Sequence, residues 1–147
     1  MKVLKISCIR SAPFVLVDCG ARQGSLDISI LEAFPQATLI GFEPDSQECA
    51  RLNQASGGQQ RFFPVAVGRC AETRTLYITG NPECSSLFRP NHEFFGKFLQ
   101  CAKAIEVLET TPVQVVALDS YLPAIGIAHV DFLKLDVQGA ELEILRG

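Results

Sequence analysis

Residues 14–24 of the chain read FVLVDCGARQG, and the expected fold follows from this stretch. The nearly continuous apolar run over residues 14–19 is typical of a strand buried on both faces, as in a parallel sheet. Residues 20–24 form a glycine-bounded turn, after which residue 25 is placed to cap a helix that we expect to end at about residue 34. A buried strand, a tight turn and a helix in this order predict an α/β protein.

The same pattern continues along the chain. Residues 37–43 predict a second buried strand, and the helix after it begins with Asp45 as its cap and Glu48 in a capping-box-like position. Residues 61–67 predict a third strand, in which Pro64 favours a sheet edge because proline donates no ladder hydrogen bond. Right-handed crossovers then give the strand order 3-2-1, with the first strand innermost.

The remaining pattern is less regular. We expect strands over residues 73–79, 112–118 and 130–136, a loop over 80–86, helices over 94–107 and from 139 onward, and a helix cap at Asp119. Ser85 and Ser86 are interpreted as turn residues of that loop, which is able to cover a site although nothing in its own sequence requires that role. We therefore predict a Rossmann-like three-layer α/β sandwich with a mostly parallel sheet, as one domain over residues 1–147 with residues 1–13 as a lead-in.

The composition excludes several classes of protein. With 48% apolar and 20% charged residues among 147, the chain is not a disordered one. The net charge of −3 and the scattered basic residues give no support for a nucleic-acid or membrane partner. No signal peptide is found, and no apolar run approaches the roughly 20 residues of a membrane span. The six cysteines form no CxxC pair, so we expect no metal site and reduced thiols in a cytoplasmic protein.

Two features of the first two strands indicate a ligand site. Asp18 ends the first strand and is followed by Gly20 and Gly24, at the place where doubly wound sheets bind nucleotide-like ligands. Glu43 ends the second strand, 23 residues after Gly20, where an acid can accept both ribose hydroxyls. A tight turn and a solvated carboxylate near a helix start remain the structural alternatives.

The glycine pattern separates the candidate ligands. A dinucleotide site uses G-x-G-x-x-G, so that the pyrophosphate rests on a helix N-terminus. This chain has G-x-x-x-G, with Arg22 in place of a middle glycine. The pattern favours a ligand without a pyrophosphate, such as S-adenosylmethionine (SAM), and leaves an NAD-dependent oxidoreductase as an alternative.

Six segments together carry a more specific pattern. In chain order they are VDCGARQG (17–24), GFEPD (41–45), AVG (66–68), SSL (85–87), VALD (116–119) and DFLKLDVQGAE (131–141). In this order they resemble the FkbM-type family of SAM-dependent methyltransferases, which have a class I, Rossmann-like fold. The resemblance covers about residues 14–147, and its most specific part is the strand that ends K-x-D-x-x-G-A-E.

The resemblance implies a cofactor, a reaction and a set of site residues. The cofactor is SAM, and the reaction is methylation of a hydroxyl on a sugar or a secondary metabolite. The methionine part of SAM would be held by the turn that contains Asp18, Gly20, Ala21 and Gly24, the ribose by Glu43, and the adenine by Val65 and Ala66.

Asp136 is the candidate catalytic residue, because the resemblance implies that it faces the transferable methyl group. At the end of its strand, a carboxylate can orient a hydroxyl or accept its proton during an in-line displacement. The other interpretation is a helix-capping aspartate before Gly139. Lys134 points to the same face of the strand, and Glu141 or Asp136 is its expected partner if that face is interior.

The chain departs from the family pattern in three ways. Arg22 stands where the family usually has Asn, and Gln138 stands where it usually has an acid. The sequence also ends one short helix after the Asp136 strand, whereas a class I methyltransferase normally has seven strands. We therefore expect a C-terminally short domain whose last strand has an exposed side, and hence a possible homodimer. A non-catalytic or incomplete SAM-binding domain is the alternative function.

Overall fold

The computed structural model describes residues 14–24, 34–95, 97–98 and 101–147. The elements in chain order are β1 (Phe14–Cys19), η1 (Arg22–Gly24), β2 (Ala37–Phe42), α2 (Ser46–Ala55), β3 (Gln60–Phe63), β4 (Ala66–Val67), β5 (Glu72–Thr79), η2 (Pro82–Cys84), α3 (His92–Phe95), α4 (Cys101–Ala104), β6 (Val107–Val116), α5 (Leu118–Ala124), β7 (Phe132–Leu135) and α6 (Glu141–Ile144). The lead-in and the helix expected from Ser25 lie outside the described residues.

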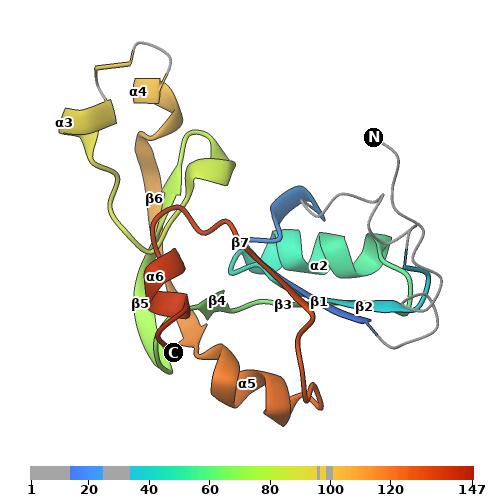
Figure 1. Ribbon diagram of the computed structural model, residues 1–147. Helices are drawn as coiled ribbons and strands as arrows, with labels where there is room; N and C mark the ends of the chain where they lie inside the picture. The colour runs from blue at the N-terminus through green and yellow to red at the C-terminus, as the bar shows by residue number, and fades with distance from the viewer. Residues whose placement is uncertain (1–13, 25–33, 96, 99–100) are drawn as a thin grey trace, which may run out of the picture.

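Four parallel strands form the main sheet, in the order β3-β2-β1-β7. The predicted order 3-2-1 is therefore confirmed, and β1 lies inside the sheet because β7 pairs with its other side (Figure 1). All four strands run in one direction, so their carboxyl ends meet at the same edge of the sheet.

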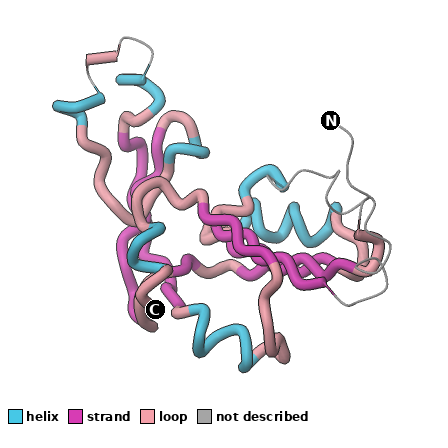
Figure 2. The backbone as a smooth tube through the Cα atoms, viewed as in Figure 1, coloured by secondary structure: helices cyan, strands magenta, loops and turns pink. Residues whose placement is uncertain are grey.

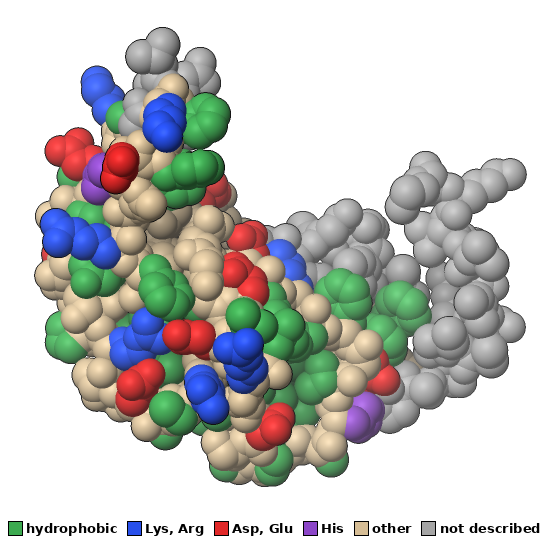
Figure 3. Space-filling model, turned by 60° about the vertical axis from the view of Figure 1, so that its left-hand side comes forward, with side chains coloured by type: hydrophobic (Ala, Val, Ile, Leu, Met, Phe, Trp, Pro, Cys, Tyr) green, Lys and Arg blue, Asp and Glu red, His purple; other side chains and the backbone are tan. Residues whose placement is uncertain are grey.

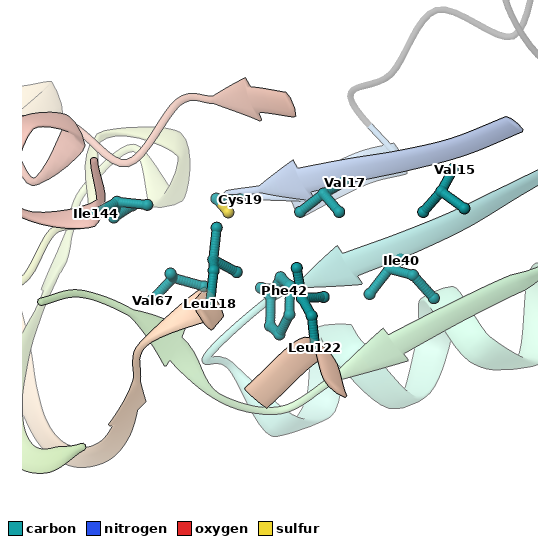
Figure 4. Packing of buried hydrophobic residues seen from close by; sticks show 9 residues of the cluster. All are labelled: Val15, Val17, Cys19, Ile40, Phe42, Val67, Leu118, Leu122 and Ile144. Atoms are coloured by element: carbon teal, nitrogen blue, oxygen red, sulfur yellow. The ribbon is translucent and has the colours of Figure 1, made fainter. Parts of the chain in front are cut away.

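One helix covers each face of this sheet, α2 on one side and α5 on the other (Figure 1). Alternate side chains of β1 serve the two faces, as a period of two requires. Leu16 packs with Leu52 of α2 in one buried cluster. Val17 packs with Leu118 and Leu122 of α5 in the other, as the close-up shows (Figure 4). This arrangement confirms a Rossmann-like α/β fold.

The start of α2 ties the sheet to the turn after β1. Asp45 caps the helix as predicted, because its carboxylate accepts hydrogen bonds from the backbone N–H groups of Gln47 and Glu48. The side chain of Glu48 does not close a capping box, since it accepts the N–H of Gln23 in the β1 turn at 3.0 Å. The N–H of Asp45 is bound instead by Glu43.

The third predicted strand is wrong as a continuous element. The chain leaves the parallel sheet at Pro64, which has no N–H to donate, and residues 66–67 continue as β4 in a second sheet of order β4-β6-β5. Figure 2 shows the two groups of strands, which meet where β3 passes into β4. In the second sheet β5 and β6 pair in antiparallel fashion over most of their length.

Two further expectations are corrected. The helix expected over 94–107 is replaced, in the described residues, by the short helices α3 and α4, and β6 begins at Val107, because it pairs with Thr79 of β5. Asp119 lies in the first turn of α5 and is not its cap, since Ala117 holds the cap position without a side-chain hydrogen bond.

The surface and the helices add two observations. On the face drawn in Figure 3, acidic and basic side chains of the described residues are interspersed. Within the described part of the chain, no helix combines the length and the apolar character needed to cross a membrane.

Gly20 lies where the chain is packed too closely for a side chain. Its φ of +86° lies in the left-handed region, and the N–H groups of Gly20 and Ala21 both donate to the carbonyl of Phe42 at 3.1 Å. A Cβ atom at Gly20 would overlap the backbone carbonyl oxygen of Asp136, which follows β7. The turn after β1 therefore fits between the ends of β2 and β7 only because this residue has no side chain.

Replacing Gly20 by alanine is expected to destabilise the fold by about 3 kcal/mol or more, because backbone strain and steric overlap add. Gly126 is a matched control, since its φ is +85° but a Cβ there would meet nothing within 4 Å. Gly126→Ala should lower the free energy of unfolding by only about 1 kcal/mol, because it adds backbone strain without steric overlap. Urea unfolding of both variants gives the comparison, and equal losses would contradict the packing argument.

Candidate functional site

A cleft of about 400 Å³ opens at the carboxyl ends of the parallel strands, with one wall from the sheet and the other from β5 and the loop after it. Its lining comprises Gly20, Arg22, Phe42, Glu43, Pro44, Asp45, Ala66, Val67, Leu76, Ile78, Asn81, Pro82, Glu83, Cys84, Ser85, Ser86, Leu87, Asp136, Val137 and Gln138. The cleft therefore brings together the turn after β1, the end of β2 and the end of β7.

Half of the predicted site residues line this cleft. They are Gly20, Glu43, Ala66 and Asp136, whereas Asp18, Ala21, Gly24 and Val65 are absent from the lining. Asp18 lies opposite Gly41 in the register of β1 and β2, so the carboxylates of Asp18 and Glu43 lie at the same end of the sheet.

The carboxylate of Asp18 is directed to β7 and away from the cleft. The residue is 1% exposed, and its Oδ1 lies 3.1 Å from the Nζ of Lys134. Lys134 also lies 3.6 Å from Oδ2 of Asp136, which was one of its two expected partners. A buried carboxylate is thus compensated by a cation on the neighbouring strand.

Glu43 is the buried carboxylate that does face the cleft. Its side chain is 5% exposed, and its Oε1 accepts the N–H of Asp45 at 2.9 Å and lies 3.7 Å from NH1 of Arg22. Burial raises the pKa of Glu43 to about 7, although the hydrogen bond from Asp45 and the charge of Arg22 act in the opposite direction. An ionisable group so perturbed in a cleft is a candidate for ligand binding.

Asp136 lies at the other end of the cleft and is more open to solvent. Its side chain is 54% exposed, and two donors, Nζ of Lys134 at 3.6 Å and Nε2 of Gln138 at 2.9 Å, approach its two oxygens. Asp136 is not the cap of α6, because Ala140 holds the cap position without a side-chain hydrogen bond. Its carboxylate is held in place and still faces the cleft.

The wall formed by the loop after β5 was not assigned to the site from the sequence. Ser86 is buried, and its Oγ donates to the carbonyl of Gln138 at 2.9 Å and accepts the N–H of Phe88 at 3.0 Å. The loop is thus fastened to the turn that carries Asp136. The SSL segment and the turn-forming residues around it were the available signal, but both are equally consistent with an ordinary turn.

The arrangement suits a polar ligand whose hydroxyl groups bind at one end of the cleft. A proton can be transferred at the other end. Glu43 supplies a buried acceptor, Gly20 leaves backbone close to the cavity, and Asp136 supplies an accessible carboxylate. Within the described residues, no group of three His, Cys, Asp or Glu side chains is arranged to hold a metal ion.

Glu43 should reduce the stability of the fold at neutral pH. Its pKa is about 7 in the folded chain and ordinarily 4.5, so the folded state binds more protons between these values and stability falls as the pH rises through them. The free energy of unfolding of Glu43→Gln, taken relative to that of the wild type, should therefore be higher at pH 8 than at pH 5 by about 1–3 kcal/mol. Urea unfolding at both pH values measures this, and an identical difference at both would refute it.

Known proteins resemble this chain along most of its length. The sequence model of the methyltransferase FkbM domain matches residues 18–147. The chain is 28% identical over 158 residues to "Methyltransferase 1" of Beauveria bassiana, with 95% of the chain and 62% of that protein covered. It is 26% identical over 150 residues to "2-O-methyltransferase NoeI" of Sinorhizobium fredii, with 97% of the chain and 60% of that protein covered.

A third relative is similar to the same extent. "Methyltransferase sdnD" of Sordaria araneosa is 29% identical over 167 residues, with 97% of the chain and 62% of that protein covered. No solved structure matches the chain significantly. The chain spans about three fifths of the length of these relatives. Because the family model matches nearly the whole sequence, the chain belongs to the methyltransferase FkbM domain family.

Proposed function

We propose that the chain binds SAM in the cleft and transfers its methyl group to a hydroxyl of a small molecule, such as a sugar or a secondary metabolite. The observation that carries the proposal is the meeting of Gly20, Glu43 and Asp136 around one cleft at the carboxyl ends of β1, β2 and β7. Family membership implies a methyl donor, which is usually SAM. The name of one relative, a 2-O-methyltransferase, supports an oxygen as the acceptor atom.

The residues of the cleft fit an adenosyl ligand. In the proposal Glu43 accepts hydrogen bonds from the ribose hydroxyls, which would compensate a carboxylate that burial otherwise disfavours. The turn at Gly20 would hold the methionine part of SAM. Asp18, Ala21 and Gly24, which do not line the cleft, would support the shape of this turn. Ala66, together with Val65, would flank the adenine.

Asp136 is the proposed catalytic residue. When bound, SAM supplies an electrophilic methyl group. Asp136 would orient the acceptor hydroxyl and take its proton, because its carboxylate lies at the cleft and is accessible. Gln138 would keep the carboxylate oriented by donating a hydrogen bond to it, and the nearby positive charge of Lys134 would stabilise its ionised form. Since more than half of the Asp136 side chain is exposed, the proton can pass on to water.

Two further aspects of function are part of the proposal. The scattered cysteines of the sequence support a cytoplasmic location. We also propose a homodimer, with β7, which borders the parallel sheet in the described part of the chain, at its interface.

Removing the Glu43 carboxylate should weaken SAM binding. Isothermal titration of the wild type should show binding, and Glu43→Ala should bind about 10- to 100-fold more weakly, because ribose hydroxyls lose a charged acceptor. Glu109→Ala is the matched control, since Glu109 is exposed on β6 and outside the cleft lining.

If the Glu43 and Glu109 variants bind SAM with equal affinity, Glu43 does not contribute to the SAM site. NAD is titrated alongside SAM, and binding of NAD in preference to SAM would favour the oxidoreductase alternative.

Asp136→Asn should leave SAM binding within about twofold of the wild type and lower methyl transfer about 100-fold or more, as loss of a general base does. Transfer is measured from radiolabelled SAM to a panel of glycosides and hydroxylated metabolites. Asp119→Asn, in the first turn of α5, is the control and should be as active as the wild type. Binding of S-adenosylhomocysteine without transfer to any acceptor would instead support the non-catalytic alternative.

A further inference from the structure

We propose that Arg22 is a positioning residue, which holds the carboxylate of Glu43 in the ionised form and orientation that a ribose requires. The inference rests on the proposed function, since it assigns a role within the same site. It concerns the one residue of the β1 turn that departs from the family pattern and also lines the cleft.

Arg22, Glu43 and Asp45 form a closed ring of contacts. NH1 and NH2 of Arg22 lie 3.3 and 3.2 Å from Oδ2 of Asp45, and NH1 lies 3.7 Å from Oε1 of Glu43. The N–H of Asp45 closes the ring by donating to the same Oε1 at 2.9 Å. In the described residues both contacts of the Glu43 carboxylate therefore use Oε1, which leaves Oε2 for a ligand.

Asp45 fixes the guanidinium in this place. Its Oδ1 caps α2 through the N–H groups of Gln47 and Glu48, while its Oδ2 binds Arg22. One carboxylate therefore anchors both a helix and the arginine. Arg22 cannot leave Glu43 without giving up its hydrogen bonds to Asp45.

The charges around Glu43 explain why its ionised form needs a positive neighbour such as Arg22. Three charged groups act on it: Arg22 from η1, Asp45 from the loop after β2, and Glu48 from α2. Burial raises the pKa of Glu43 most and the charges of both acids add to this, whereas the hydrogen bond from the N–H of Asp45 and the positive charge of Arg22 lower it. Cys49 is also near Glu43: burial, followed by the charge of Glu43, raises the pKa of the Cys49 thiol. A thiol carries no positive charge, so Cys49 does not stabilise the Glu43 carboxylate.

The turn itself does not depend on the guanidinium. Its backbone is held by the N–H groups of Gly20 and Ala21 on the carbonyl of Phe42, and by the N–H of Gln23 on Glu48. A variant that lacks the Arg22 side chain keeps these bonds, so we expect it to fold. A loss of ligand affinity in such a variant would then report on Glu43 and not on a collapsed turn.

The test is a titration of S-adenosylhomocysteine between pH 6 and pH 8.5 into the wild type, Arg22→Ala, Arg22→Lys and Arg51→Ala. Arg51 is the matched control, because its guanidinium pairs with Glu48 on α2 at 2.7 Å and lies outside the cleft lining. Comparing variants at each pH cancels the titration of the ligand's own amino group.

Arg22→Ala should bind about three- to fivefold more weakly than the wild type at pH 7, the factor expected for a partly buried ion pair. The deficit should shrink toward pH 8.5, where Glu43 ionises without help. Arg22→Lys should recover part of the affinity, and Arg51→Ala should follow the wild type. A deficit of the same size at every pH, or no deficit, would overturn the role of Arg22.

A second readout needs no ligand and separates this inference from the proposed function. Unfolding in urea should show that Arg22→Ala loses more stability at pH 8 than at pH 5, because the pair with Glu43 exists only when Glu43 is ionised. Arg51→Ala should show no such difference, since Glu48, whose pKa is about 2, is ionised at both. If the wild type binds no adenosyl ligand, the proposed function fails and this measurement alone decides on Arg22.

Discussion

The close approach of three strand ends at Gly20 is the constraint on which the rest of the structure depends. The turn after β1 is bonded to the carbonyl that ends β2 and lies against the carbonyl that follows β7. Asp136 in turn donates its N–H to Cys19 at 3.0 Å. Backbone packing therefore sets the relative positions of the segments that carry the candidate ribose acceptor, the glycine turn and the candidate base.

The two buried carboxylates near this point are compensated in different ways, and the difference is informative. Asp18 has the ammonium of Lys134 at 3.1 Å, so its burial is balanced within the protein. Glu43 has a guanidinium at 3.7 Å that it shares with Asp45, and burial still dominates its pKa. On the wall of a cleft, a buried carboxylate whose charge the protein only partly balances can accept further hydrogen bonds from a ligand.

The parallel core was predictable from the sequence because its signals are local. Apolar runs such as residues 14–19 and the cap at Asp45 lie within a few residues of what they determine. The second sheet was not predictable, since the start of β6 at Val107 depends on its pairing with β5, 28 residues earlier in the chain at Thr79. The same holds in the site: Glu43 was found by spacing, whereas the ring around Arg22 depends on side-chain contacts between two segments.

Two of the acids that line the cleft, Glu43 and Asp136, have opposite physical requirements. Glu43 is buried, poorly compensated and costly when ionised, which suits a group that gains hydrogen bonds from the hydroxyls of a ligand. Asp136 is exposed, accepts a hydrogen bond from Gln138 and lies near the charge of Lys134, which suits a group that must accept a proton and then release it. A fold selected only for stability would not retain a carboxylate such as Glu43, because a neutral residue of the same shape avoids the desolvation. Its presence on the cleft wall is the physical argument that this end of the sheet serves binding.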